Sequence, residues 1–368
     1  MAAARVAILG AGVVGLAVAR SLARRGASVV VVDAAREARE ASWAAAGILG
    51  VGSEHGTKDP LFRLCLDAFD RWPSTAHDLE RETGIALRLR REGTLVLARD
   101  DDERAALEAR AAFHRDHGIP SRVLDPAEAA AREPRASRAI RAALWIPEAR
   151  LDNRALRQAL VASCRALGVG LLEGVAVSRI DERAGRVRGV ATSGGPLDAD
   201  AVVLSAGAWT DALATTTGLS LPTVPVKGQM LRLAAPDGFL SHVVERGAHY
   251  VVPRAGSGLV VGTTSEQSGW DRSLDASTLA SVEAAARDLV PDAASLPRAE
   301  AWSGFRPRLA DGLPALGPVR ARAGLFVATG HYRNGILLCA RTGDLVARAV
   351  LGDVDPALAP FSPDRFAS

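Results

Sequence analysis

A glycine-rich turn near the N-terminus constrains the fold more than any other feature of this chain. The apolar run at residues 6–9 leads into the turn "GAGVVG", a helical pattern follows to residue 25, and a second apolar run, "SVVVVD", ends at Asp33. In such a strand–turn–helix–strand unit, the first glycine permits the tight turn and the second lets a pyrophosphate approach the backbone. The third lets the helix and the strand pack closely. The glycines in these positions are Gly10, Gly12 and Gly15.

The acidic residue that closes the second strand narrows the choice of ligand. Asp33 follows the turn by about 20 residues, the spacing at which a carboxylate accepts a hydrogen bond from a ribose hydroxyl. An acid in this position disfavours a 2′-phosphate. The unit is therefore predicted to bind a dinucleotide other than NADP.

Composition excludes several other classes of protein. A length of 368 residues is about twice that of a typical domain, so two domains are expected. The three cysteines, Cys65, Cys164 and Cys339, are widely spaced, which favours a reducing cytoplasm over a disulfide framework and gives no metal-type pair. The 45 basic residues include only two lysines and are spread along the chain, so no nucleic-acid partner is expected.

The N-terminus also resembles a secretory signal, because it combines a charge, an apolar stretch and the ending Ala17-Val18-Ala19. Cleavage there would destroy the glycine turn and leave "SVVVVD" without its partner strand, so the nucleotide-binding interpretation is preferred. No other apolar run approaches the ~20 residues of a membrane span. We expect a cytoplasmic protein without a membrane partner or a bound metal, and a homo-oligomer.

Pieces of a nucleotide-binding fold recur at the start, middle and end of the chain, with strand-rich segments between them. A helix is predicted from Asp67 to Arg81, and the charged helix "RDDDERAALEARAAFHRDHG" is expected to carry His114 and His117 at its surface. A β-meander is expected over residues 170–205. We therefore predict an α/β protein in which a doubly wound, Rossmann-like domain is interrupted by a β-sheet-based substrate domain. The expected division is 1–85, 144–220 and 311–368 for the nucleotide domain, and 86–143 and 221–310 for the substrate domain.

Motifs along the whole chain carry a more specific signal than the glycine turn. "TGHYRNGILL" (329–338) places a polar turn between an apolar strand and a helix. With it, in familiar order and spacing, occur "AILGAGVVGLAVA", "SWAAAGILG" followed by Glu54, "PVKGQ", "HYVVPR", "LVVGTT" and "GFRPRLADGLPALG". In these motifs the chain resembles the D-amino acid oxidase-like FAD-dependent oxidoreductases, and within them the glycine oxidases of thiamin biosynthesis.

The resemblance implies a non-covalently bound FAD. Residues 331–337 would wrap the pyrimidine edge of the flavin ring, and the N-terminus of the last helix would point at N1 and C2=O. Reduced flavin carries negative charge there, which a positive helix end stabilises. The implied cofactor-binding residues are Gly10, Gly12, Val13, Val14, Gly15, Asp33, Ala34, Ala41, Ser42, Ala46, Gly47, Ile48, Val177, Gly207, His331, Tyr332, Arg333, Asn334, Gly335, Ile336 and Leu337.

The resemblance also implies where an amino acid substrate binds. Arg306 in "GFRP" and Tyr250 in "HYVVP" would hold the carboxylate, because a guanidinium fork offers two hydrogen bonds and a phenol adds a neutral donor. Without the resemblance, Tyr250 would be taken as an aromatic that packs within a strand. Arg333 is a further candidate for facing the substrate. Ser265 stands where glycine oxidases have a methionine beside the substrate side chain, so a wider pocket is expected.

The implied reaction is the oxidative deamination of glycine or another small amino acid. The flavin N5 atom would accept a hydride from Cα, so no catalytic side chain is expected. The imine would become an oxoacid and ammonia unless a partner such as thiazole synthase takes it, and oxygen would be reduced to hydrogen peroxide. Oxidation of sarcosine or D-amino acids, and a dehydrogenase with a non-oxygen acceptor, stay open. A non-catalytic FAD-binding module would not need Arg306, so Arg306, Tyr250 and Arg333 together argue against it.

Overall fold

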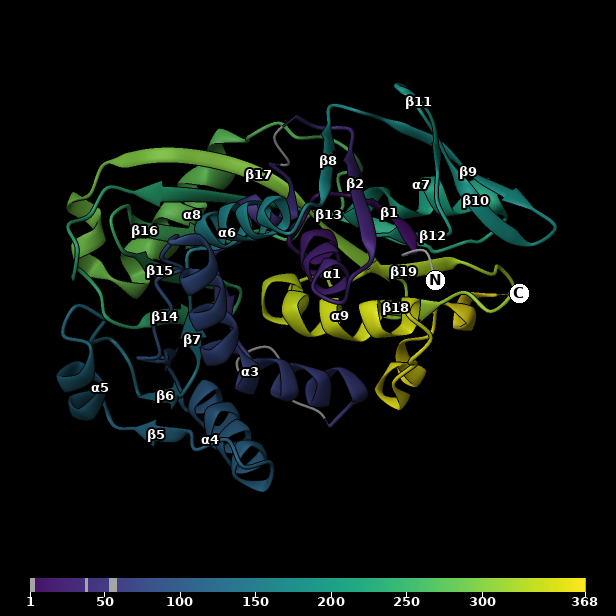
Figure 1. Cartoon of the computed structure of the whole chain (residues 1–368). Coiled ribbons are helices and arrows are strands. Elements are labelled where there is room, and N and C mark those ends of the chain that lie inside the picture. Colours follow the sequence, from purple (N-terminus) through teal and green to yellow (C-terminus); the bar gives the residue numbers. More distant parts are fainter. Residues whose placement is uncertain (1–3, 37–38, 53–57, 368) are drawn as a thin grey trace.

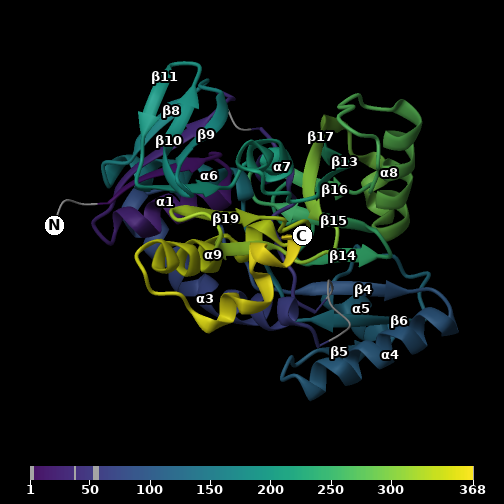
Figure 2. The same cartoon turned by 90° about the vertical axis from the view of Figure 1, so that its right-hand side faces the viewer.

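The structure is a computed structural model that describes residues 4–36, 39–52 and 58–367. Within these residues the strands form two large sheets, a three-stranded sheet and a two-stranded one (Figure 1). Glu54, which belongs to one of the motifs above, lies outside the described residues. Seen from the side, the parallel sheet with its helices occupies one part of the molecule and the second large sheet occupies the other (Figure 2).

The first large sheet is the parallel sheet that the sequence predicts. Its order is β18-β19-β12-β1-β2-β8, and neighbouring strands are parallel except for β18 and β19. Val6 and Ile8 of β1 belong to the core under the helices, whereas Ala7 and Leu9 belong to the core on the other face. Burial on both faces is typical of parallel strands, and the predicted doubly wound α/β class is confirmed. The strands are β1 (Arg5–Leu9), β2 (Ser28–Asp33), β8 (Gly170–Glu173), β12 (Ala201–Leu204), β18 (Ala315–Pro318) and β19 (Leu325–Thr329).

Helices cover one face of this sheet. They are α1 (Val13–Ala23), α3 (Pro60–Thr83), α6 (Asn153–Ala166) and α9 (Gly335–Val350). Helices α1 and α9 run side by side (Figure 1), and a Cβ atom on Gly343 of α9 would lie 2.7 Å from the carbonyl of Ala17 in α1. Helix α3 begins earlier than its apolar pattern predicts, because Asp59 accepts the N–H of Phe62 and Pro60 fills the first helical position.

The other face carries a small antiparallel sheet and helix α7 (Thr210–Ala214). Its strands are β9 (Val177–Arg183), β10 (Arg186–Thr192) and β11 (Gly195–Asp198). The single β-meander expected over 170–205 is therefore wrong at both ends. Strand β8 pairs in parallel with β2, and β12 lies between β1 and β19 in the parallel sheet. The sequence pattern of a strand does not show which distant strand it pairs with. The distant partners determine where β8 and β12 lie.

The second large sheet has the order β17-β13-β16-β15-β14-β4-β6-β5, and its pairs are antiparallel except for β14 with β4. Helix α8 (Ala276–Leu289) packs on β13 and β15, while α4 (Asp101–Asp116) and α5 (Pro126–Arg132) pack at the far end (Figure 2). The strands are β4 (Thr94–Ala98), β5 (Arg122–Leu124), β6 (Ala142–Ile146), β13 (Thr223–Leu233), β14 (Val243–Arg246), β15 (His249–Arg254), β16 (Gly258–Gly262) and β17 (Arg298–Leu309).

One expectation for α4 is wrong. His114 is buried, with Nδ1 2.8 Å from Ser121 Oγ and Nε2 3.1 Å from the carbonyl of Gly52. Burial lowers the pKa of this imidazole. The apolar side of this charged helix is narrow, so the sequence pattern alone did not place the histidine on it.

Shorter elements complete the described chain. They are α2 (Ala41–Ala44), the paired strands β3 (Ile48–Leu49) and β7 (Ala149–Arg150), and the 3₁₀ turns η1 (Gly207–Trp209), η2 (Thr215–Thr217), η3 (Pro291–Ser295), η4 (Pro356–Phe361) and η5 (Pro363–Phe366). Across the ranges that the structure describes, no helix combines the length and the apolar character needed to cross a membrane.

Candidate active site

The three glycines of the N-terminal turn have different roles in the structure. Gly10 has φ +115°, and a Cβ atom there would lie 2.5 Å from the carbonyl oxygen of Ser205. A Cβ atom on Gly15 would lie 2.1 Å from the carbonyl oxygen of Gly10, so this position requires close packing. Gly12 lines a cavity, as Gly10 also does, but the nearest atom to a Cβ on Gly12 would be Ser42 Oγ at 3.2 Å. The second glycine is thus the one that exposes backbone to a ligand.

Asp33 lies at the end of β2 and also lines the cavity. One carboxylate oxygen accepts the N–H of Ala11 at 2.7 Å, and the other accepts the N–H of Ala35 at 2.8 Å. These bonds fix the carboxylate beside the glycine turn. Each oxygen keeps a second lone pair, so Asp33 can still accept a hydrogen bond from a ligand hydroxyl.

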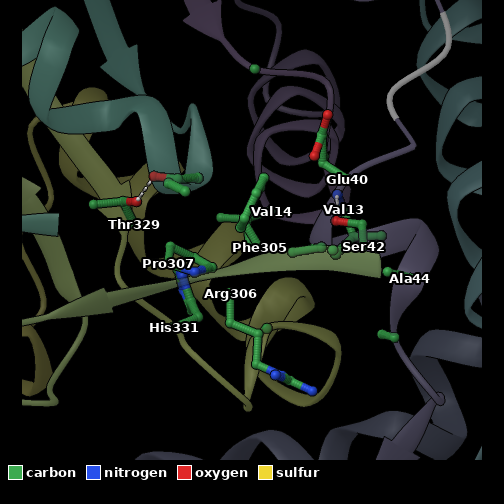
Figure 3. Close-up of a pocket in the computed structure, with 18 of the residues that line it drawn as sticks. Val13, Val14, Glu40, Ser42, Ala44, Phe305, Arg306, Pro307, Thr329 and His331 are labelled. Carbon is green, nitrogen blue, oxygen red and sulfur yellow. Dashed lines mark hydrogen bonds between the residues drawn. The ribbon is translucent and has the colours of Figure 1, made fainter. Parts of the chain in front are cut away.

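The cavity has a volume of about 490 Å³ and begins at the ends of strands β1, β2 and β12. This is the edge at which open α/β sheets bind ligands. In Figure 3, Ser42 lies beside Val13. Arg306 and Pro307 of β17 lie near His331, which belongs to the turn before α9. The predicted residues that line it are Gly10, Gly12, Val13, Val14, Asp33, Ala34, Ala41, Ser42, Ala46, Gly47, Ile48, Val177, Gly207, Tyr250, Arg306, His331, Tyr332, Arg333, Asn334, Gly335, Ile336 and Leu337.

Two predicted residues do not line the cavity. Gly15 lies behind the turn, in contact with Gly10. Ser265 is exposed in the loop after β16, and its hydroxyl lies 3.3 Å from the hydroxyl of Tyr332. Arg333 is exposed and lines the cavity. A direct contact between Ser265 and a small substrate therefore stays a prediction.

The polar turn before α9 presents backbone to the cavity. Gly330 and Tyr332 both have positive φ angles, of 81° and 48°, and the N–H of Tyr332 donates to the carbonyl of Pro307 at 3.0 Å. Asn334 begins the helix without a side-chain cap, so the first N–H groups of α9 stay available on the side of the cavity. Helix α1 also begins at the cavity, which places two positive helix ends on its wall.

His331 is a buried residue of this turn. Its Nε2 atom lies 3.0 Å from the hydroxyl of Thr342, and burial lowers the pKa of the imidazole to about 4. The ring is therefore neutral at pH 7. The imidazole carries no positive charge toward the cavity, so the positive potential at this wall comes from the helix end and from Arg333.

The small-residue segment 41–48 is held in place by side chains that the sequence did not single out. Asn153 donates from Nδ2 to the carbonyls of Ser42 (2.7 Å) and Trp43 (3.0 Å). Arg254 donates to the carbonyls of Ala45 (3.3 Å) and Ala46 (3.5 Å) and to Asn153 Oδ1. Burial lowers the pKa of Arg254 to about 10. The motif "HYVVPR" contains Arg254, but only the fold shows that it supports this segment.

Arg306 and Tyr250 lie on strands of the second large sheet and line the same cavity. Arg306 is half-buried, and its guanidinium donates to Thr263 Oγ1 at 2.7 Å and to the carbonyl of Thr264 at 3.1 Å. Among the residues that the structure describes, no carboxylate forms an ion pair with Arg306. Tyr250 is buried, with its hydroxyl 3.9 Å from Met230 Sδ. The sheet thus places a cation and a phenol at one end of the cavity.

A cluster at another part of the wall connects distant segments. Trp209 lines the cavity and stacks with the exposed Trp270 at 4.9 Å between ring centroids. Arg272 lies over the Trp209 ring and donates to Glu40 Oε1 at 2.7 Å. The loop that carries Trp270 and Arg272 is attached by Lys227, which is buried and pairs with two of its carboxylates. Trp209, Arg272 and Glu40 come from segments far apart in the sequence, which is why motif reading missed their contacts, whereas Lys227 belongs to the motif "PVKGQ".

The described part of the chain contains no group of His, Cys, Asp and Glu residues that could hold a metal ion. Its three cysteines are buried, and none of them is in a disulfide. Burial raises the pKa of the Cys339 thiol, which follows the start of α9, to about 12. This thiol therefore stays protonated and unreactive at neutral pH.

Comparisons with known proteins identify relatives of this chain. The family described as "FAD dependent oxidoreductase" matches residues 5–349. The chain is 39% identical over 365 residues to a glycine oxidase of Geobacillus kaustophilus, covering 98% of this chain and 96% of the relative. It is 34% identical over 368 residues to the "Bifunctional protein ThiO/ThiG" of Trichormus variabilis, covering 98% of this chain and 55% of that protein. The crystal structure of glycine oxidase from Geobacillus kaustophilus has a TM-score of 0.94 at 38% identity, with 99% of this chain and 100% of the other covered.

The cavity fits FAD. Asp33 can hold the ribose, the open backbone at Gly12 and the start of α1 can hold the pyrophosphate, and the start of α9 can face the flavin ring. The predominantly apolar walls suit a large aromatic ring. With a family match over most of its length, the chain belongs to the DAO family of FAD-dependent oxidoreductases and is an enzyme that uses FAD.

Proposed function

We propose that the protein catalyses the oxidative deamination of glycine or another small amino acid, with oxygen reduced to hydrogen peroxide. One observation carries the choice of substrate class. The guanidinium of Arg306 lines the cofactor cavity and pairs with no carboxylate of a described residue. A half-buried cation with only neutral partners favours an anionic ligand, and a guanidinium fork matches a carboxylate.

Tyr250 supports the same assignment. Its buried side chain lines the cavity with Arg306 and can add a neutral hydrogen bond to a carboxylate oxygen. A small carboxylate held by these two side chains leaves its α-carbon and amine directed into the remaining cavity. The binding energy at the carboxylate would then orient the carbon that reacts.

FAD, when bound, supplies the two-electron chemistry by accepting a hydride from the α-carbon. The residues of this chain bind the carboxylate, hold the substrate in one orientation and exclude water. The amine must react as the neutral base. His331 is buried against Thr342 rather than directed at a substrate amine, so it is not assigned a proton-transfer role.

The overall reaction balances without a further reagent. The amino acid loses two electrons and two protons to become an imine, and oxygen takes up both to become hydrogen peroxide. Water then converts the imine to an oxoacid and ammonia. The relatives named glycine oxidase support glycine as the first substrate to test.

The proposal is tested by adding glycine, sarcosine and D-alanine separately to the purified holoenzyme without oxygen, and recording the flavin absorbance. Glycine or another of these amino acids should bleach the flavin, and air should restore it with hydrogen peroxide formed. Bleaching without recovery in air would replace the oxidase with a dehydrogenase that uses another acceptor. Bleaching by simple amines but by no amino acid would contradict the proposal.

We also propose a domain division, a cellular location, an oligomeric state and a partner for this enzyme. The predicted division into an FAD-binding domain (1–85, 144–220 and 311–368) and a substrate domain (86–143 and 221–310) assigns the parallel sheet to the first. It assigns the second large sheet to the second, except for the last three residues of β6. A cytoplasmic, homo-oligomeric enzyme is proposed. Thiazole synthase is the proposed consumer of the imine, supported by the relative "Bifunctional protein ThiO/ThiG", of which this chain spans 55%.

A further inference from the structure

The head of Arg306 is held on one side by two oxygen atoms of a single short segment. Its Nη2 atom donates to Thr263 Oγ1 at 2.7 Å, and its Nη1 atom donates to the carbonyl of Thr264 at 3.1 Å. Thr263 is buried and lines the cavity. A guanidinium carries five N–H groups in a fixed plane, so two of them are used here and the others stay available for a ligand.

The same guanidinium lies against the backbone of a glycine of the sheet. Gly228 lies on β13, where it pairs with Gly304 of β17, two residues before Arg306. A Cβ atom on Gly228 would lie 2.4 Å from Nη1, 2.5 Å from Nη2 and 2.7 Å from Cζ of Arg306. The backbone of Gly228 does not have a positive φ angle, so its conformation does not require glycine. The absence of a side chain instead lets the guanidinium lie against the sheet.

Together these contacts define the position of a flexible side chain. Arg306 has several rotatable bonds, and fixing such a side chain on binding lowers the affinity for a ligand unless the side chain is held beforehand. The oxygen atoms of Thr263 and Thr264 fix the direction of the guanidinium. The absence of a side chain on Gly228 sets how close the guanidinium lies to the sheet. Neither contact compensates the positive charge.

We propose that Gly228 and Thr263 are positioning residues that hold the guanidinium of Arg306 ready for a substrate carboxylate. The inference rests on the proposed function, because it assumes that Arg306 binds a carboxylate. Without the hydroxyl of Thr263, the fork turns away from its binding orientation. With a methyl group at position 228, the fork is lifted from the sheet.

The test uses the holoenzyme and glycolate, which has the carboxylate of glycine but no amine. Binding of glycolate is followed by the change in flavin absorbance, and KM and kcat for glycine are measured in parallel. Thr263→Val keeps the shape of the side chain and removes the acceptor. A lost hydrogen bond to a charged group should raise the Kd for glycolate and the KM for glycine roughly 10- to 100-fold. Thr263→Ser keeps the acceptor and should bring both values back close to those of the parent.

Thr94→Val is the matched control, because Thr94 is a buried threonine of the second large sheet whose hydroxyl has no hydrogen-bond partner among the described residues. It should leave glycolate binding unchanged. Gly228→Ala provides an independent test in case Thr263→Val loses FAD. The atoms that its methyl group meets belong to the movable end of a side chain, so the variant should fold, keep FAD and bind glycolate at least tenfold more weakly.

The possible outcomes separate a failure of the proposed function from a failure of the positioning role. A parent enzyme that neither binds glycolate nor oxidises an amino acid contradicts the proposed function itself. If the parent does both, but Gly228→Ala and a folded Thr263→Val keep the parental Kd, the positioning role is overturned and the proposed function stands. Equal losses in Thr263→Ser and Thr263→Val would assign the effect to packing rather than to the hydrogen bond, and would also overturn the role of Thr263.

Discussion

Replacing Arg306 by alanine is the most direct test of the substrate site. The side chain contributes a positive charge to the cavity, and among the described residues no carboxylate neutralises it. Its removal leaves a bound carboxylate with Tyr250 as a neutral donor and with the exposed Arg333 at another part of the wall. Thr263, whose hydroxyl loses this donor, lines the cavity and can bind water instead.

The expected loss follows from the burial of the contact. Truncating one partner of a buried, hydrogen-bonded charge pair typically costs about 2–5 kcal/mol. At about 1.4 kcal/mol for each factor of ten, kcat/KM for glycine should fall roughly 30- to 4,000-fold. Arg306→Lys should recover only part of the loss, because an ammonium restores the charge without the two-pronged geometry.

The assay compares two kinds of substrate in each variant. Initial rates of hydrogen peroxide formation give kcat/KM for glycine, and flavin absorbance gives the FAD content of the same preparation. Simple amines that lack a carboxylate should be poor substrates of the parent and should lose little further activity in Arg306→Ala. The FAD content should not change, because none of the proposed cofactor-binding residues lies on β17, the strand of Arg306.

Two results would refute this reasoning. An equal loss of amine and amino acid oxidation in Arg306→Ala would make the residue structural rather than a carboxylate ligand. Full recovery by Arg306→Lys would show that charge alone matters and that the fork geometry around Thr263 has no role.

Four further predictions test other parts of the structure. Acid precipitation of the holoenzyme should release intact FAD into the supernatant; flavin that stays with the precipitate would contradict non-covalent binding. Gly343→Ala should lower stability by about 1–3 kcal/mol through overpacking against Ala17, although alanine is the better helix former, and thermal unfolding measures this. Because His331 has a folded pKa of about 4, below its unfolded value, its contribution to stability is complete above about pH 6.5 and falls by about 3 kcal/mol as the pH decreases toward 4. Denaturant unfolding of the parent and of His331→Gln is measured over this pH range, and the unfolding free energy should depend less on pH in the variant. Arg254→Met leaves the carbonyls of Ala45 and Ala46 without the Arg254 donor and should lower the unfolding free energy by about 1–3 kcal/mol, together with the melting temperature and FAD retention; an unchanged FAD affinity would show that this segment needs no such support.

Local spacing made part of the site predictable. The glycine turn and Asp33 belong to one continuous unit, in which each residue type answers a local requirement such as a positive φ angle, close packing or an exposed acceptor. The turn at 331–337 is also continuous, so its place before a helix could be predicted from the chain alone. Such features depend on neighbours within a few tens of residues.

The supports of the site could not be predicted in the same way. Ser205 packs against Gly10, and Asn153 and Arg254 hold the backbone of a segment more than a hundred residues earlier. Gly228 has no sign in the sequence that distinguishes it from a turn or bulge glycine. Its role depends on a side chain of the neighbouring strand, and the pairing of β13 with β17 is a property of the fold.

The strand order of the parallel sheet has a consequence for how the protein is made. Strand β19 pairs with β12 in the interior of the sheet, and α9 after it supplies the wall against which the flavin is expected to lie. Domains generally fold as units while the ribosome releases the chain from its N-terminus. Here the strands β1, β2 and β12 leave the ribosome long before residues 325–350, so the nucleotide-binding half cannot close until residues 325–350 have also been made. The newly made chain therefore passes through a cofactor-free stage in which β12 lacks a partner on one edge, and a chain that stops before α9 has no finished pocket for the cofactor to enter.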